Sequence, residues 1–265
     1  MRHLFSRCLA GLALLAGLML PPVSAMADAL PDRVAALGGH PCDLGALTCV
    51  TLTVPVDPEN PGTTMDVEFA VHFANNASKG ILVYVVGGPG GSGLAVADDY
   101  LAAFDARLAD EMDVVFFDQR GTGPLSGLTC AAAQVAFDQA DLSTDRPDAA
   151  ITAAQDFVTA CLAEIDHADL LPFVDTNRAI GDLEAFRVAL GSPKVWLYGE
   201  SYGTQYVQQY AVRYPAAVSG VVIDGVVDLA LDSDGFYLSA LTTTEALLQR
   251  TDKAAPVIIW RRPRY

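Results

Sequence analysis

The feature that most restricts the fold is a short turn, Gly199-Glu200-Ser201-Tyr202-Gly203, which matches the pattern Gly-x-Ser-x-Gly. An apolar strand pattern at 195–198 leads directly into it, and a helical pattern at 204–214 follows directly after it. In such a strand–turn–helix the serine adopts a strained backbone conformation at the tip of the turn, and side chains two positions away on either side would collide with the strand or the helix. An ordinary glycine-rich turn would show the same five residues, but the context favours a serine nucleophile at Ser201.

Strand and helix patterns alternate along the rest of the chain. Alternating apolar and polar residues predict two half-buried strands, at 49–56 and 67–73. Continuous apolar runs predict strands that are buried on both faces, at 81–86, 112–117, 195–198 and 218–223. This alternation predicts an α/β fold, a mostly parallel sheet with helices on both faces, and the first two strands would form its antiparallel edge.

The clearest helical pattern covers 175–190, and a shorter one covers 100–108. We expect Thr176 to cap the longer helix at its start and Gly191 to end it. The apolar residues predicted on one face are Ile180, Leu183, Phe186 and Leu190. The residues predicted on the opposite face are Asp182, Glu184 and Arg187.

A second glycine-rich segment, Gly87–Gly93 (Gly-Gly-Pro-Gly-Gly-Ser-Gly), follows the predicted strand 81–86. Glycines at the carboxyl end of a strand let backbone N–H groups approach a ligand oxygen closely. Because Pro89 has no N–H, we expect the N–H groups of Gly88 and Tyr202 to form an oxyanion hole. A nucleotide phosphate loop is disfavoured, because the segment fits neither G-x-G-x-x-G nor a loop ending in Gly-Lys-Ser/Thr.

A third segment, Asp118-Gln119-Arg120-Gly121-Thr122-Gly123, also follows a predicted strand. Three strand ends therefore converge on one edge of the sheet, where the ligands of open α/β sheets bind. Arg120 could contact a substrate there. The interpretation that we favour is that Arg120 pairs with a buried acid and holds these loops in place.

The amino terminus has the pattern of a cleaved signal peptide. Arg2 and Arg7 precede an almost unbroken apolar run at 9–20, which is followed by prolines and by small residues suited to cleavage. The alternative, a membrane anchor, is disfavoured because the run is shorter than the ~20 residues that a span needs. We therefore expect residues 1–27 to be removed, the protein to be exported to the periplasm or the medium, and no stable membrane span to remain.

The predicted export affects how the cysteines are interpreted. Cys8 lies in the predicted signal peptide, and an even number remain, namely Cys42, Cys49, Cys130 and Cys161. In an oxidising compartment they suggest two disulfides, and of the three pairings we favour Cys42 with Cys49 and Cys130 with Cys161. The close Cys-x-x-Cys spacing and the nearby histidine pair of a metal site are missing, so we expect no metal and no other cofactor.

The charge balance restricts the partners. The formal net charge is −16, with 32 acidic and 16 basic residues. Because nucleic-acid binding needs a positive patch, we expect no nucleic-acid partner. The composition indicates no particular oligomeric state.

The three segments together resemble a known family. The turn at Ser201 implies the α/β-hydrolase fold, and Gly-Gly-Pro-Gly with Asp-Gln-Arg-Gly resembles the prolyl iminopeptidases. The full Gly87–Gly93 segment, the signal peptide and the cysteine pairs look closer to the secreted tripeptidyl aminopeptidases of the same peptidase group. Val86 stands where prolyl iminopeptidases usually have histidine, which also favours the secreted branch. The resemblance covers roughly residues 40–235.

The family pattern of serine, acid and histidine is not complete in this sequence. A serine hydroxyl needs a base, and the four histidines, which are His3, His40, His72 and His167, all precede Ser201. The acids that follow Ser201 come one strand too early for the family's order, and they are Asp224, Asp228, Asp232 and Asp234. The resemblance implies a helical lid and two further strands, for which too few residues follow Ile223.

These observations define the expected organisation. Residues 28–250 would form the N-terminal part of an α/β-hydrolase domain without its lid and last strands, and 251–265 an atypical basic tail. Five of the 16 basic residues but one of the 32 acidic residues lie in 250–265, which suggests a shifted reading frame or premature stop, with an ordinary basic tail as the alternative.

The expected activity is that of an exported serine hydrolase, which acts on a peptide or a small ester or amide. The resemblance implies an aminopeptidase-type peptidase that forms an acyl-enzyme at Ser201, inactive or impaired as this chain. The alternatives are an esterase or lipase of the same fold and a non-catalytic hydrolase-fold fragment.

Overall fold

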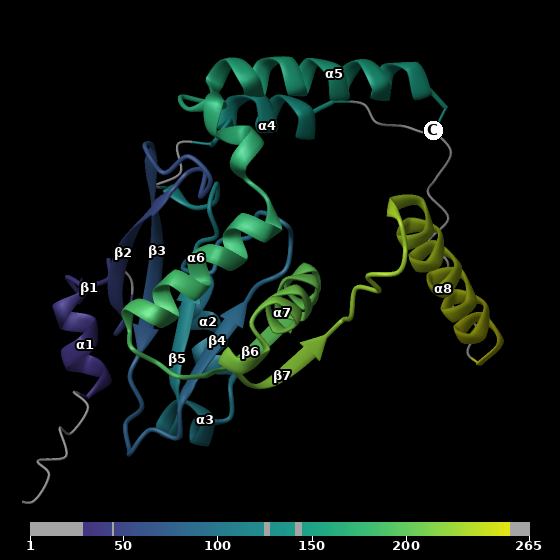
Figure 1. The fold of residues 1–265 in the computed structure, drawn as a ribbon. Helices are drawn as coiled ribbons and strands as arrows, with labels where there is room; N and C mark the ends of the chain where they lie inside the picture. The colour runs from purple at the N-terminus through teal and green to yellow at the C-terminus, as the bar shows by residue number, and fades with distance from the viewer. Residues whose placement is uncertain (1–28, 44, 125–127, 141–144, 255–265) are drawn as a thin grey trace, which may run out of the picture.

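The computed structural model describes residues 29–43, 45–124, 128–140 and 145–254, and the side chains up to residue 250 (Figure 1). One sheet has the strand order β1-β2-β3-β5-β4-β6-β7. Its strands are β1 (His40–Pro41), β2 (Thr48–Pro55), β3 (Thr64–His72), β4 (Ile81–Val85), β5 (Asp113–Phe117), β6 (Val195–Glu200) and β7 (Val218–Asp224). The four strands β5-β4-β6-β7 are parallel, whereas β1, β2 and β3 form an antiparallel edge. The predicted architecture is confirmed.

Helices cover both faces of the sheet. They are α1 (Leu30–Ala36), α2 (Ala97–Ala103), α3 (Ala106–Glu111), α4 (Ala131–Asp138), α5 (Pro147–Glu164), α6 (Thr176–Ala189), α7 (Tyr202–Arg213) and α8 (Ser233–Ala254), with short 3₁₀ turns η2 (Ala168–Phe173) and η3 (Pro215–Ala217). Buried side chains of α1, α6 and α7 pack on one face, and α2 packs on the other. The predicted single helix at 100–108 is wrong, because Phe104 is extended and the Asp105 side chain caps α3 as a new helix.

Two residues determine where α6 begins and ends. Asp175, and not the predicted Thr176, is the N-cap, because its carboxylate accepts the Arg178 N–H at 2.9 Å. Gly191 has φ +62° directly after the helix, which confirms the predicted stop. The predicted apolar face is buried, at Ile180, Leu183, Phe186 and Leu190.

Several details of the sheet differ from the prediction. The short strand β1, which was not predicted, contains His40 paired with Cys49, and β3 begins three residues before the predicted strand 67–73 and ends one residue before its end, at His72. Neither β6 nor β7 is buried on both faces as predicted, because Trp196 is 43% exposed and Val221, Val222 and Ile223 are 40–48% exposed. Among the described residues, β6 is the one strand that pairs with β7, which leaves its other edge unpaired.

Both predicted disulfides are present, Cys42–Cys49 and Cys130–Cys161. The second joins α4 to α5, which lie side by side and stand away from the sheet in Figure 1. The rings of Phe137 and Phe157 also meet between these helices, with centroids 5.2 Å apart. The pair α4–α5 is therefore held together both covalently and by packing.

No helix in the described part of the chain is both long and apolar enough for a membrane span. The predicted signal peptide at 1–27 lies outside the described residues, and so do 255–265 of the predicted tail.

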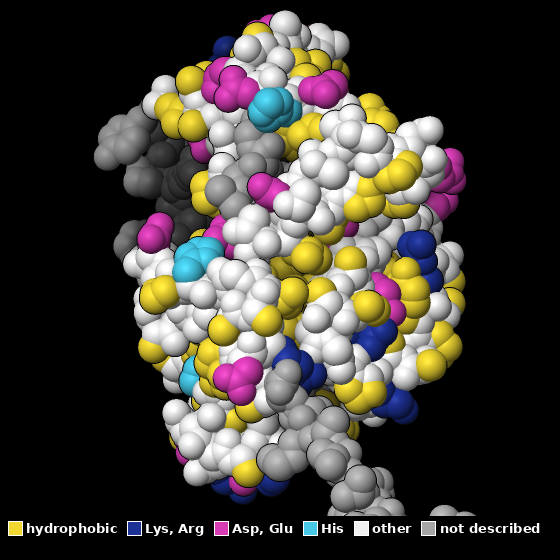
Figure 2. Space-filling view, turned by 60° about the vertical axis from the view of Figure 1, so that its left-hand side comes forward, with side chains coloured by type: hydrophobic (Ala, Val, Ile, Leu, Met, Phe, Trp, Pro, Cys, Tyr) yellow, Lys and Arg dark blue, Asp and Glu magenta, His cyan; other side chains and the backbone are white. Residues whose placement is uncertain are grey.

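Among the side chains coloured in Figure 2, Lys and Arg form small separate groups on the visible face.

Candidate active site

Ser201 lies at the tip of the turn between β6 and α7. Its φ of 51° makes it the one non-glycine residue with a positive φ among the described residues. The Ser201 N–H donates to the Asp224 carbonyl of β7 at 2.8 Å, and the Thr204 hydroxyl donates to the Ser201 carbonyl at 2.7 Å. Hydrogen bonds on both sides therefore hold the conformation, and the Ser201 side chain is exposed to solvent.

The two glycines of the turn meet a steric requirement. A Cβ on Gly199 would lie 2.4 Å from the Gly203 carbonyl oxygen. A Cβ on Gly203 would lie 2.1 Å from the carbonyl oxygen of Val85, at the end of β4. Both contacts are with backbone atoms that cannot turn away, so the sequence-based reason for glycine at these positions is confirmed.

The segment Gly87–Gly93 lies directly beside the serine. A Cβ on Gly87 would be 3.1 Å from the Ser201 Cβ, so the two backbones are in close contact. Asp118, at the end of β5, anchors the segment by accepting from the Ser92 hydroxyl at 2.7 Å and the Leu94 N–H at 3.2 Å. The predicted convergence of three strand ends on one edge is thus observed.

A cavity of about 880 Å³ opens at this edge. The residues proposed from the sequence, Ser201, Gly88 and Tyr202, all lie on its wall. Neither the N–H of Gly88 nor that of Tyr202 donates to another described residue. The Tyr202 hydroxyl is hydrogen-bonded to the Thr176 side chain at 2.8 Å, and burial raises the pKa of this phenol.

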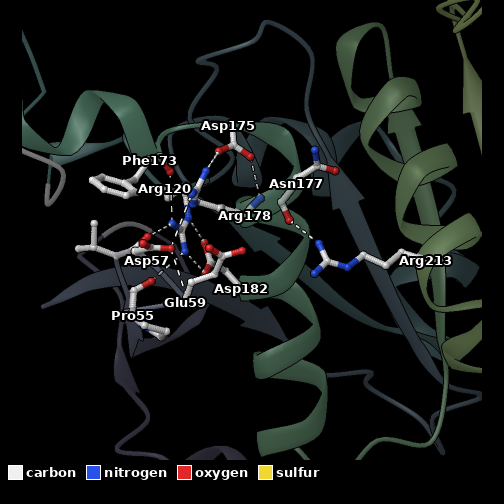
Figure 3. A network of polar contacts seen from close by, with 11 residues as sticks. Pro55, Asp57, Glu59, Arg120, Phe173, Asp175, Asn177, Arg178, Asp182 and Arg213 are labelled. Atoms are coloured by element: carbon white, nitrogen blue, oxygen red, sulfur yellow. Dashed lines mark hydrogen bonds and ion pairs between the residues drawn. The ribbon is translucent and has the colours of Figure 1, made fainter. Parts of the chain in front are cut away.

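Arg120 forms a buried ion pair with Asp182 of α6 (Figure 3). Its Nε and Nη2 donate to the two carboxylate oxygens at 2.7 and 2.6 Å, and other donors reach the carbonyls of Val56 and Phe173. The favoured interpretation of Arg120 is therefore confirmed. Asp182, predicted on the opposite face from the core residues, is 3% exposed. Burial raises the pKa of Asp182, and the Arg120 guanidinium opposes that shift.

A second arginine strengthens the same region (Figure 3). Arg178 donates to the Asp175 carboxylate at 2.5 Å and lies 3.6 Å from that of Asp57. Its guanidinium also packs over the Phe173 ring, 5.1 Å from the centroid. This cluster could not be predicted from the sequence, because Asp57 is more than a hundred positions from Arg178.

None of the described histidines hydrogen-bonds to Ser201. His72 bonds to the Ala109 carbonyl at 3.0 Å and lies opposite Val114, towards the amino end of β5 and away from the serine's edge. His40 contacts the Gly38 carbonyl at 3.3 Å on the far antiparallel edge. His167 directly precedes η2, in the connection between α5 and α6, and His3 lies outside the described residues.

A cluster of tyrosines and carboxylates on the α2 side of the sheet was also not predicted from the sequence. The hydroxyls of Tyr84 and Tyr100 both donate to the Glu200 carboxylate, the first at 2.7 Å. The Tyr198 hydroxyl donates to the Asp224 carboxylate at 2.8 Å, which raises the pKa of Tyr198 to about 12. Since side chains alternate along a strand, the shared face of Tyr198 and Glu200 was a usable signal.

Within the described ranges, no three His, Cys, Asp or Glu side chains come together in a way that could hold a metal ion. The chemistry that the cavity wall offers comes from the serine hydroxyl and from the backbone N–H groups around it.

Comparison with known proteins agrees with the fold. Residues 80–256 match the family model described as alpha/beta hydrolase fold. The chain is 30% identical over 191 residues to the serine protease Hip1 of Mycobacterium tuberculosis, which covers 69% of the chain and 36% of that protein. It is 30% identical over 203 residues to the tripeptidyl aminopeptidase of Streptomyces lividans, covering 70% and 36%. The chain thus spans about a third of the length of these curated relatives.

A solved structure, the proline iminopeptidase of Mycobacterium smegmatis, matches 64% of the chain and 42% of its own length. The sequence identity is 20% and the TM-score is 0.39.

Proposed function

The chain belongs to the alpha/beta hydrolase fold family, and we propose that it carries the nucleophile and the oxyanion hole of an exported serine peptidase of the aminopeptidase type. The observation that carries the proposal is the exposed Ser201 at the tip of its strained turn, on the wall of a cavity that it shares with Gly88 and Tyr202. A nucleophile and two candidate N–H donors on one cavity wall are what acyl transfer requires.

The reaction would proceed by acyl transfer. The Ser201 oxygen attacks the substrate carbonyl carbon and loses its proton to a base, and the carbonyl oxygen becomes an oxyanion. The N–H groups of Gly88 and Tyr202 would bind that oxyanion, and the loss of one such donor typically costs ~3–4 kcal/mol of transition-state stabilisation. Collapse of the intermediate expels the protonated amine, and water then releases the acyl group from Ser201.

We favour peptides as substrates because the curated relatives are named as peptidases. Of the two curated proteins at 30% identity, one is named a serine protease and the other a tripeptidyl aminopeptidase. Two disulfides support export, since such bonds persist in oxidising compartments. The second candidate is an esterase, because the same nucleophile and oxyanion hole serve ester cleavage.

We further propose that these 265 residues alone acylate slowly, because no histidine follows Ser201 and the described ones do not bond to it. Without the base, the oxyanion hole and substrate binding leave ~10³–10⁴-fold catalysis over the reaction in water.

The test is covalent labelling of the disulfide-bonded chain with a fluorophosphonate, followed by mapping of the labelled peptide. We expect slow labelling at Ser201, none in Ser201→Ala, and an acceleration when imidazole is added as an external base. Prompt labelling without imidazole would refute the proposal that these residues lack the base. A label on another residue would refute Ser201 as the nucleophile.

A second probe pair separates the two candidates. Tripeptide phosphonates with a free or an acetylated amino terminus are compared in the presence of imidazole. Faster labelling by the free amine supports the aminopeptidase. The esterase is supported if the two tripeptide phosphonates label at equal rates and an alkyl fluorophosphonate labels faster than either.

A further inference from the structure

We propose that Glu200 is a positioning residue that ties the two halves of the oxyanion hole together through Tyr100. The inference rests on the proposed function, because it assumes that the Gly88 and Tyr202 N–H groups bind the same oxyanion. It assigns a role to a residue that occupies a variable position of the Gly-x-Ser-x-Gly pattern.

One carboxylate oxygen of Glu200 connects three elements, which are β6, β4 and α2. Glu200 is the last residue of β6 and directly precedes Ser201. Its Oε2 accepts from the hydroxyl of Tyr84, on β4, at 2.7 Å and from the hydroxyl of Tyr100, on α2. The rings of the two tyrosines pack on each other with centroids 4.5 Å apart, and Tyr84 is 2% exposed. Both donors are therefore held in place by packing.

Glu200 is connected to both halves of the oxyanion hole, the Gly88 N–H and the Tyr202 N–H. On one side, Glu200 is two residues from Tyr202. On the other side, α2 follows the segment Gly87–Gly93, so Tyr100 is connected to the half that contains Gly88. Within the described part of the chain, the Tyr100–Glu200 bond is the one side-chain hydrogen bond that joins α2 to the turn at Ser201.

Such a tie has a direct chemical consequence. Two oxyanion donors act together only if both lie about 2.7–3.1 Å from the same oxygen. A misplacement of about 1 Å in a reacting group costs ~10²-fold in rate. The Tyr100 hydroxyl is protonated at neutral pH, as a phenol normally is, and can therefore donate to Glu200; this hydrogen bond in turn raises the pKa of Tyr100.

The first measurement is hydrogen exchange by mass spectrometry, which needs no activity. We compare wild type with Tyr100→Phe, Glu200→Ala and Glu200→Gln. We expect Tyr100→Phe and Glu200→Ala to raise exchange in two segments at once, 87–96 and 201–205. Glu200→Gln retains a carbonyl oxygen that can accept from Tyr100, and it should restore wild-type exchange.

The matched control is Tyr210→Phe. It removes another tyrosine–glutamate hydrogen bond, from Tyr210 of α7 to Glu184 of α6 at 2.7 Å, on the opposite face of the sheet. We expect it to leave exchange in 87–96 unchanged. If Tyr210→Phe has the same effect as Tyr100→Phe, or if exchange rises in only one of the two segments, the tie is overturned.

The second measurement is the rate of fluorophosphonate labelling at Ser201 in the presence of imidazole. We expect about a 10-fold loss in Tyr100→Phe and Glu200→Ala, and a change below twofold in Glu200→Gln and Tyr210→Phe. Equal rates in all four variants overturn the tie. If wild type itself does not label, the proposed function fails, while the exchange result still decides whether Glu200 links the two segments.

Discussion

Arg120 and Asp182 form a two-point ion pair, with N–O distances of 2.7 and 2.6 Å, between the segment after β5 and helix α6. Their side chains are 1% and 4% exposed, so each charge depends almost wholly on the other for compensation. The other donors of the guanidinium reach the backbone carbonyls of Pro55, Val56 and Phe173, so Arg120 fixes the segments beside the candidate active site.

Removal of one partner should destabilise the protein strongly. A lone buried charge has neither water nor a counter-charge, so we expect Asp182→Ala to lower the free energy of unfolding by about 3–5 kcal/mol. Urea unfolding measures this. The control is Lys79→Ala, which removes an exposed ion pair with Glu111 and should change stability far less than Asp182→Ala does. A loss below 1 kcal/mol in Asp182→Ala would mean that Arg120 is solvated.

Two helical glycines should respond in opposite ways to the same substitution. In Gly203→Ala the new Cβ would meet the Val85 carbonyl oxygen at 2.1 Å, and we expect a loss of at least about 3 kcal/mol. At Gly181, in α6, no atom outside the adjoining backbone of the helix lies within 4 Å of the added Cβ. There alanine should stabilise the helix by about 1 kcal/mol. Thermal and urea unfolding of both variants test the pair, and similar stabilities would contradict the steric argument.

The Tyr198–Asp224 hydrogen bond should make stability depend on alkaline pH. The pKa of Tyr198 is about 12 in the folded protein, against 10.0 normally, because its protonated hydroxyl donates to the carboxylate. The contribution is present below pH 10 and is lost as pH rises from 10 to 12, since the unfolded chain deprotonates first.

The measurement is urea unfolding at pH 9, 10 and 11, in which Tyr198→Phe should lose stability less steeply than wild type. Other tyrosines also have raised pKa values, so the difference between the two proteins, and not the slope itself, is the readout. Identical slopes would show that this bond does not survive in solution.

The Cys130–Cys161 disulfide should control the α4–α5 pair locally. It spans 31 residues, and chain-entropy arguments assign such a loop about 3–4 kcal/mol. In Cys130→Ala/Cys161→Ala we expect chymotrypsin to cleave near Phe137 and Phe157 while the sheet stays protected.

The control for this experiment is Cys42→Ala/Cys49→Ala, which opens a loop of seven residues worth about 2 kcal/mol and should leave α4–α5 resistant. Cleavage throughout the chain in the first variant would mean that the pair is not a separate unit.

Much of the site was readable from the sequence because its requirements are local. The turn at Ser201 needs glycine at 199 and 203 for steric reasons that involve only adjacent elements. The core side of α6 followed from the spacing of four apolar residues. The close approach of Gly87 to Ser201 followed from the parallel strands that precede each of them.

Other features depended on partners far away in the sequence. Helical spacing placed Asp182 on the side away from the core residues, and only the arrival of Arg120, 62 positions away, accounts for its burial. The apolar run of β7 predicted burial, but whether a strand is covered depends on its neighbours in the sheet. Neither outcome is encoded in the local pattern.

The sequence by itself determined the elements, the turn at Ser201 and the edge of the sheet where the chemistry gathers, because periodicity and glycine sterics act over a few residues. The tertiary structure alone decided which polar side chains meet: Arg120 with Asp182, and Glu200 with Tyr84 and Tyr100. The physical reason is that a buried charge or hydroxyl takes whichever partner the packing of distant segments brings within hydrogen-bond distance.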